Sequence, residues 1–240
     1  MESETEKILA QTLVKNGDQW MLVNASALHD QPLWLMRKLV RKIIFSLKSN
    51  LRDVAFSEVE RAVEFIRKPD YGTTCQVTDH LEIVKYDQDC VLFAAKTALL
   101  NDLWPQLEPT LESIPLDTGK VSLSGGWELT VRRLEEIPAS ALTENPWEAL
   151  LDEAKINDPL TLGVRKDGEL FMPFGMADRS LKLGDFFTNE HLPQRARAAW
   201  PLIRSGERIV WVPGYRIAEF CRVAHGTRSV LKLELTQEKK

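Results

Sequence analysis

The sequence predicts an α+β protein, in which a helical pair with small sheets precedes a compact C-terminal domain that mixes sheet and helix. Three observations support this fold class. Apolar residues repeat at the helical period over 32–48 and 56–68. Short strand-like segments follow between 74 and 94. From 160 onward, alternating apolar residues are interrupted by closely spaced Gly and Pro.

The first part of the chain contains one predicted helix and one predicted strand. The helix covers 2–15, where four apolar residues share one side, and the polar turn 16–18 ends it. The strand covers 20–23, and polar residues after it are suited to a turn or to capping a helix.

Residues 32–48 give the strongest helical pattern in the sequence. One side carries apolar residues, namely Leu35, Met36, Leu39, Val40, Ile43, Ile44 and Leu47. The opposite arc is about 140° wide at the helical spacing, and it carries the basic residues Arg37, Lys38, Arg41 and Lys42. Trp34 and Phe45 project into this basic arc. Cations interleaved with rings are typical of an RNA-binding surface, where charge meets phosphate and a ring stacks on a base. The alternative interpretation is a solvated charged face whose two rings pack on a neighbouring helix.

A second helix is predicted over 56–68, with Ser57 as its N-cap and Glu60 completing a capping box. Three strands should follow, at about 74–77, 81–86 and 91–94. Further along, two strand-like segments flank Ser124-Gly125-Gly126 and predict a hairpin, with strands at 121–123 and 127–134.

The last domain is predicted to cover 158–236 and to begin with a half-buried strand over 160–164. A turn rich in Gly and Pro follows. Next come a short helix with Leu183, Phe186 and Phe187 at helical spacing, a second short helix opened by Pro193, and a buried strand over 209–212.

This last domain also supplies a second group of candidate binding residues. They are Arg165, Lys166, Arg179 and Lys182 around the turn, and Arg195 and Arg197 on the second short helix. Gathered on one face, these side chains could hold a nucleic-acid backbone. Scattered solvated charge, with nearby carboxylates as weak partners, is the alternative.

The overall charge of −4 is unevenly distributed. Residues 158–235 contain 12 Lys and Arg against 9 Asp and Glu, whereas residues 1–157 contain 17 against 25. This asymmetry favours two domains and gives weak support for a polyanionic partner of the second one.

Several classes of protein are disfavoured by the sequence. No apolar run approaches the roughly 18 to 20 residues of a membrane span, and the acidic start lacks the apolar core of a signal peptide. The 3 cysteines and 4 histidines form no CxxC or HExxH cluster. We therefore expect a cytoplasmic protein without a metal site, and we identify no catalytic constellation in the chain.

The last third of the chain resembles the C-terminal domain of the tRNA(Ile)-lysidine synthetases. Five motifs carry the resemblance: Arg165 with Gly168 and an acid, Phe171 to Met176, Lys182 to Phe187, Leu192 to Arg197, and Ile209 to Ala218. The one departure within them is the acid itself, which is Glu169 where the family pattern has Asp. The upstream part resembles, more weakly, the helical substrate-binding region of these enzymes.

The resemblance implies an organisation and a role. The implied parts are an N-terminal helix or linker at 1–19, a tRNA substrate-binding region at 20–156, and the synthetase C-terminal domain at 158–236. These enzymes use ATP to join lysine to the wobble cytidine of an isoleucine tRNA with a CAU anticodon. The ten basic residues named above are then the expected tRNA-binding residues.

The ATP site of the family is missing from this sequence. The family binds ATP through an SGGxDS-type loop, but here Ser124-Gly125-Gly126 continues into a strand-like segment, which favours a hairpin turn. We therefore expect ATP and Mg²⁺ to belong to a PP-loop catalytic domain supplied in cis or in trans, and the chain alone to be inactive. The alternative is a stand-alone, non-catalytic RNA- or protein-binding module.

Overall fold

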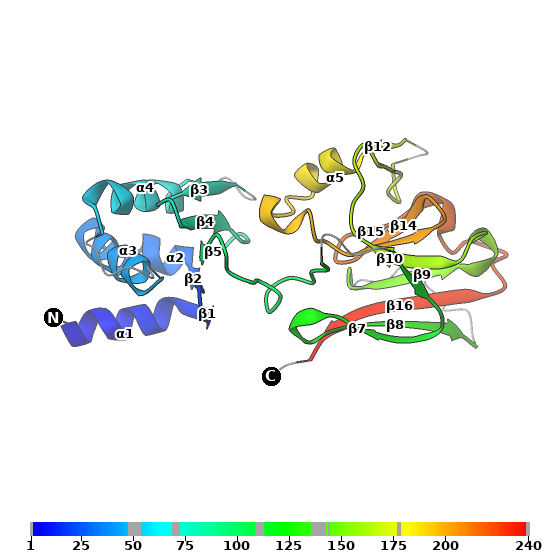
Figure 1. Cartoon of the computed structure of the whole chain (residues 1–240), viewed down its shortest axis with the longest axis horizontal. Helices are drawn as coiled ribbons and strands as arrows, with labels where there is room; N and C mark the ends of the chain where they lie inside the picture. Colours follow the sequence, from blue (N-terminus) through cyan, green and yellow to red (C-terminus); the bar gives the residue numbers. More distant parts are fainter. Residues whose placement is uncertain are drawn as a thin grey trace. The chain divides into compact units, whose positions relative to one another are not determined.

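The computed structural model describes residues 2–47, 54–68, 73–108, 113–135, 143, 145–176 and 179–238. The chain divides into two compact units, Met1–Leu99 (unit 1) and Leu100–Lys240 (unit 2) (Figure 1). Each unit combines helical segments with small antiparallel sheets, which confirms the α+β class predicted from the sequence.

Unit 1 contains nine described elements. They are α1 (Glu2–Thr12), β1 (Leu13–Gly17), β2 (Trp20–Asn24), α2 (Ala25–His29), α3 (Leu33–Leu47), α4 (Phe56–Ile66), β3 (Thr74–Gln76), β4 (Leu81–Lys85) and β5 (Cys90–Ala95). The strands form one antiparallel sheet in the order β1-β2-β5-β4-β3. The strands predicted between 74 and 94 are thereby confirmed, as is the strand after the first turn.

Helix α3 is the central helix of unit 1, packed between α1 and α4 (Figure 1). Its apolar side is buried as predicted: Leu39, Val40, Ile43 and Ile44 are each 0% exposed. These side chains form one core cluster with residues of α4 and with strand residues such as Phe93. Burial of this side leaves the basic side of α3 at the surface.

Two local predictions for unit 1 are wrong. The first helix ends at Thr12, because Leu13 to Gly17 form β1 and satisfy their backbone groups by pairing with β2. The capping box is also misplaced. Helix α4 has Ala55 at its N-cap position, and the carboxylate of Glu58 accepts a 3.0 Å hydrogen bond from the Ala55 amide. Glu60, which the sequence assigned to the cap, is therefore available for another contact.

Unit 2 consists mainly of strands. They are β6 (Ile114–Leu116), β7 (Gly119–Ser122), β8 (Trp127–Leu134), β9 (Glu148–Asp152), β10 (Leu160–Gly163), β11 (Leu170–Phe171), β12 (Leu181–Lys182), β13 (Leu202–Ser205), β14 (Arg208–Val212), β15 (Arg216–Ile217) and β16 (Val230–Gln237). The helical segments are α5 (Leu183–Asn189) and the 3-10 turns η1 (Ser124–Gly126), η2 (Glu153–Lys155), η3 (Gln194–Ala196) and η4 (Glu219–Cys221).

These strands form two larger sheets and one small hairpin. One sheet has the order β15-β14-β13-β10-β6, the second has the order β7-β8-β16-β9, and β11 pairs with β12. The predicted hairpin around η1 is confirmed, since β7 and β8 pair antiparallel. So are the short helix with two phenylalanines, α5, and the buried strand that ends before a Pro-Gly turn, β14.

The division between the units differs from the boundary expected near residue 157. Strand β16 pairs along its length with β8 and also with β9, and β10 pairs with β6. Residues 100–156 therefore share sheets with the C-terminal segment, so they fold with unit 2. A boundary inferred from local composition does not register such long-range pairing.

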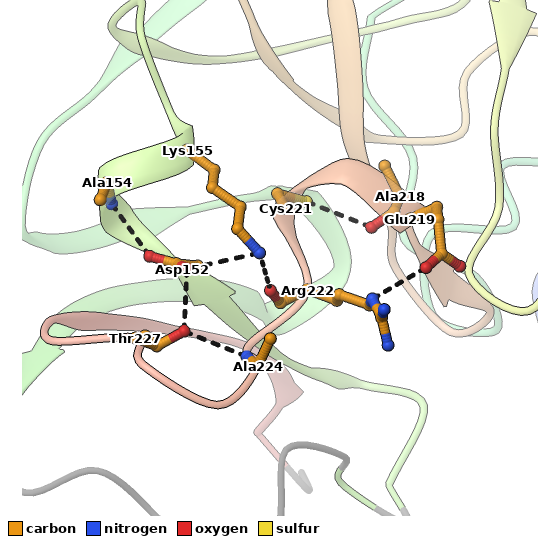
Figure 2. Close-up of polar contacts among 9 residues, drawn as sticks. All are labelled: Asp152, Ala154, Lys155, Ala218, Glu219, Cys221, Arg222, Ala224 and Thr227. Atoms are coloured by element: carbon orange, nitrogen blue, oxygen red, sulfur yellow. Dashed lines mark hydrogen bonds and ion pairs between the residues drawn. The ribbon is translucent and has the colours of Figure 1, made fainter. Parts of the chain in front are cut away.

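A buried carboxylate connects β9 to the loop that precedes β16. Figure 2 shows Asp152 between η2 and that loop: it accepts hydrogen bonds from the Ala154 amide (3.2 Å) and the Thr227 hydroxyl (2.8 Å). Lys155 lies 3.4 Å from the same carboxylate and donates to the Arg222 carbonyl at 2.8 Å. These contacts fix the loop beside the sheet.

Candidate nucleic-acid interface

The surface side of α3 carries two exposed aromatic rings. Trp34 is 64% exposed and Phe45 is 49% exposed, although both belong to a helix whose other side is fully buried. The interpretation in which these rings pack on a neighbouring helix is therefore not supported. Both rings are open to a partner.

The four cations predicted to bind RNA on α3 have different surroundings. Arg37 forms a bidentate ion pair with Glu60 of α4, in which Nε and Nη2 donate to the two carboxylate oxygens at 2.5 and 2.8 Å. This hydrogen bonding lowers the pKa of Glu60 below its usual range. The Arg37 guanidinium also lies 5.7 Å from the centre of the Phe56 ring.

Lys42 is held on the other flank of the helix by α1. Its Nζ lies 2.8 Å from Glu6 Oε1, and this hydrogen bond lowers the pKa of Glu6. Lys38 and Arg41 are exposed and have no hydrogen bond or ion pair with any residue that the structure describes. The predicted basic face therefore contains two cations held by acids and two that are free.

The first two basic residues predicted in unit 2 lie in the loop after β10, and both have acidic neighbours. Arg165 Nη2 is 3.6 Å from Asp167 Oδ1, and Lys166 Nζ is 2.9 Å from Glu207 Oε2. The bond from Lys166 lowers the pKa of Glu207. Both pairs are solvated, so either cation could exchange its carboxylate for a phosphate at small cost.

Of the remaining four predicted residues, two are engaged within the chain and two have no polar partner among the described residues. Arg197 is half-buried, and its guanidinium donates to the Leu192 carbonyl at 2.9 Å and to the Thr188 hydroxyl at 3.0 Å. Burial, with a smaller contribution from the Arg165 cation, lowers the pKa of Arg197. Arg195 is also engaged within the chain. By contrast, the side chains of Arg179 and Lys182 are exposed and have no polar partner among the residues with described positions.

The loop that carries Arg165 and Lys166 is anchored by a buried ion pair that the sequence analysis did not identify. Arg204 and Glu169 have side chains only 3% and 7% exposed, and Arg204 Nε and Nη2 donate to the carboxylate at 2.6 and 2.9 Å. Arg204 also donates to the Val164 carbonyl at 2.8 Å, and Glu169 accepts from the Lys166 amide at 3.0 Å. Glu169, which departs from the family pattern, is thus a structural anchor.

A shallow cavity of about 440 Å³ lies beside this loop, lined by Lys166, Glu169, Phe171 and Ser180 among others. At its edge the Arg208 guanidinium stacks 3.4 Å from the centre of the Phe220 ring. This pair was not predicted from the sequence, because its members are twelve positions apart on different elements. No local spacing signals such a contact.

The Ser-Gly-Gly segment is a turn between two paired strands. Gly125 and Gly126 have φ values of +73° and +74° within η1, between two paired strands. A Cβ on Gly125 would lie 2.0 Å from the Asn101 carbonyl oxygen, so glycine is required there by packing. The Gly125 carbonyl accepts a 3.0 Å hydrogen bond from Gln237. The loop therefore serves the fold of unit 2.

The cysteines are not activated. Burial raises the pKa of Cys221 to about 12 and that of Cys90 to about 11, and it also raises the pKa of Cys75. Cys221 donates to the Ala218 carbonyl at 3.4 Å (Figure 2). A protonated thiol is a poor nucleophile, so the geometry supports a binding surface better than a thiol-based reaction. The described part of the chain contains no group of three or more potential metal ligands, and none of its helices has the length and apolarity of a membrane span.

Part of the C-terminal region matches a known family model. Residues 160–233 match the family model described as TilS substrate C-terminal domain. A solved structure described as the crystal structure of the TILS C-terminal domain superposes with a TM-score of 0.47 and 20% identity, covering 54% of this chain and 98% of that one.

Several tRNA(Ile)-lysidine synthases match this chain along much of its length. The one from Caldanaerobacter subterraneus subsp. tengcongensis is 26% identical over 238 residues, which are 99% of this chain and 49% of the relative. The one from Dehalococcoides mccartyi is 28% identical over 235 residues, 98% of this chain and 48% of the relative. This chain is thus a relative of the tRNA(Ile)-lysidine synthases, as its motifs indicated, and it spans about half their length.

Proposed function

We propose that this chain is the tRNA-binding part of a tRNA(Ile)-lysidine synthase, and that it holds an isoleucine tRNA with a CAU anticodon while a separate catalytic domain modifies the wobble cytidine. The modification joins lysine to that cytidine with ATP. The catalytic PP-loop domain is supplied in cis or in trans, and the chain alone is inactive. Its place of action is the cytoplasm.

The observation that carries this proposal is the set of free cations in a chain related to these synthases. Lys38 and Arg41 in unit 1, and Arg179 and Lys182 in unit 2, are exposed without a polar partner among the described residues. Free surface cations release counterions when they meet phosphate, which is the main source of affinity for nucleic acid. A smaller contribution to phosphate binding is expected from the ion-paired residues, because each must first leave a carboxylate. These residues are Arg37, Lys42, Arg165 and Lys166.

ATP and Mg²⁺ are assigned to the catalytic domain for a physical reason. The one Ser-Gly-Gly segment of the sequence lies in a hairpin turn whose glycine faces a backbone carbonyl, so it offers no cradle for a phosphate. We therefore propose that the residues of this chain bind and orient tRNA, and that the transfer of lysine takes place on the catalytic domain.

The proposal is tested by equilibrium binding of the purified chain to an isoleucine tRNA transcript with a CAU anticodon, at a series of salt concentrations. Four phosphate contacts would give a slope of about −3 in a plot of log K against log salt. Replacing Lys38 and Arg41 with Gln should weaken binding and reduce the slope by about 1.5. The matched variant carries Gln at exposed Lys7 and Lys96, so it loses the same charge; it should weaken binding only slightly and leave the slope unchanged. Absence of tRNA binding at low salt would refute the proposal.

A second assay separates a synthase part from a stand-alone binding module. The purified chain is mixed with a catalytic domain from a related synthase, and lysidine formation is measured with ATP and lysine. We expect product only when both parts are present. Tight tRNA binding without any stimulation of the catalytic domain would favour the stand-alone module.

A further inference from the structure

The free cations and exposed rings of α3 lie on one narrow stripe. At 100° per residue, positions 34, 38, 41 and 45 fall within an arc of about 60°, opposite the buried side of the helix. With a rise of 1.5 Å per residue, the stripe is about 16 Å long. Its order along the helix is ring, cation, cation, ring: Trp34, Lys38, Arg41 and Phe45. We call these four residues the α3 stripe.

The two flanks of the stripe are closed by neighbouring helices. Arg37 on one flank is paired with Glu60 of α4, and Lys42 on the other is paired with Glu6 of α1. Helix α3 itself contains no acidic residue. Within the described part of the chain, Lys38 and Arg41 are therefore the cations of α3 without a carboxylate partner, and they lie between two open rings.

We propose that the α3 stripe binds unpaired nucleotides of an RNA, with a base stacked on Trp34, another on Phe45, and the intervening phosphates on Lys38 and Arg41. This inference rests on the proposed tRNA-binding function and specifies the part of the RNA involved. A paired base hides both of its faces in the helical stack, so an exposed ring adds little to duplex binding. An unpaired base offers a free face to an aromatic side chain, and this stacking depends little on base identity.

The test compares three RNA probes: a hairpin with a CAU-containing loop, a duplex with a single-stranded 3′ overhang, and a blunt duplex of the same stem. We expect the first two to bind more tightly than the blunt duplex, and the preferred one of the two identifies the source of the unpaired nucleotides. Trp34→Ala and Phe45→Ala should each weaken binding of the preferred probe by about tenfold, while binding of the blunt duplex stays the same. Trp34→Phe should retain most of the affinity of the parent protein, because it keeps an aromatic ring.

Two control variants lie just outside the stripe. Phe56→Ala removes a ring that is 70% exposed on α4, and Lys42→Gln removes a cation that is already paired with Glu6. Both should weaken binding much less than the stripe variants. Intrinsic fluorescence gives an independent measurement, since Trp34 is the most exposed of the 7 tryptophans. Binding should quench a long-wavelength emission that Trp34→Phe lacks.

Three results would overturn the inference. If the tRNA transcript binds but the ring variants match the controls, the α3 stripe is not the site, although the proposed function stands. If no RNA binds, both the inference and the proposed function fail. If Trp34→Ala or Phe45→Ala changes the oligomeric state of the RNA-free protein in solution, the α3 stripe is a contact between protein molecules.

Discussion

The buried pair of Arg204 and Glu169 allows a quantitative test of how the loop after β10 is held. Replacing Glu169 with Leu removes two charge-assisted hydrogen bonds and leaves a guanidinium that is 3% exposed without its counter-ion. Breaking one side of a buried pair costs about 3–5 kcal/mol. Since 1 kcal/mol corresponds to about 2–4 °C in a protein of this size, we expect Tm to fall by about 10 °C.

The assay is thermal unfolding followed by calorimetry and by near-ultraviolet circular dichroism. The double variant Glu169→Leu with Arg204→Met should recover much of the loss, because two apolar groups fill the same space without a buried charge. Glu207→Gln is the matched control: the Glu207 side chain is 86% exposed, so removing this partner of Lys166 should leave Tm almost unchanged. Equal effects of Glu169→Leu and Glu207→Gln would refute the argument that burial makes the pair important.

Two further predictions concern the stability of unit 2. Gly125→Ala should destabilise the protein far more than Gly126→Ala, since both have φ near +73° but only the first would place a Cβ within 2.0 Å of a backbone carbonyl; equal losses in urea unfolding would contradict this. The hydrogen bond with Lys232 lowers the pKa of Glu148. The pair therefore stabilises the fold fully above about pH 4.3, the pKa of Glu in the unfolded chain. This stabilisation is lost as the pH falls through the lower pKa of the folded state. The difference in unfolding free energy between the parent and Glu148→Gln should therefore be larger at pH 7 than in strong acid; a constant difference would rule out the ionised pair as its cause.

The sequence predicted best those elements whose cause is local. The buried side of α3 follows from the spacing of its apolar residues, and α5 follows from Leu183, Phe186 and Phe187 at helical spacing. The turn at Gly125 was likewise predictable, because a glycine pair between two alternating segments favours a hairpin.

Contacts between positions far apart in the sequence could not be predicted. The boundary between the units depends on β16 pairing with β9 and β8, which lie about 80 and about 100 residues earlier. The same holds for the candidate interface: ten cations were predicted, but their availability depends on acids elsewhere in the chain. Glu60 was misassigned to a helix cap, although its carboxylate lies on Arg37, 23 positions away. Residue type identifies a cation, whereas only the fold shows whether it is free.

That distinction leads to a gain-of-affinity experiment. Glu6→Gln and Glu60→Gln would release Lys42 and Arg37 from their ion pairs while keeping the size of the side chains. The two flanking cations would then be free to meet phosphate beside Lys38 and Arg41. We expect the double variant to bind isoleucine tRNA more tightly than the parent, with the salt slope steeper by about 0.7–0.9 for each released cation that reaches a phosphate.

Removing negative charge anywhere on unit 1 would also favour RNA, so the control must separate these two effects. Glu4 on α1 and Glu64 on α4 are exposed acids with no hydrogen bond or ion pair to any described residue. The variant with Gln at both positions changes the net charge by the same amount and releases no cation. It should raise affinity slightly and leave the salt slope unchanged, because no new phosphate contact forms. If both double variants steepen the slope equally, the ion pairs on the flanks of α3 do not control which cations can bind.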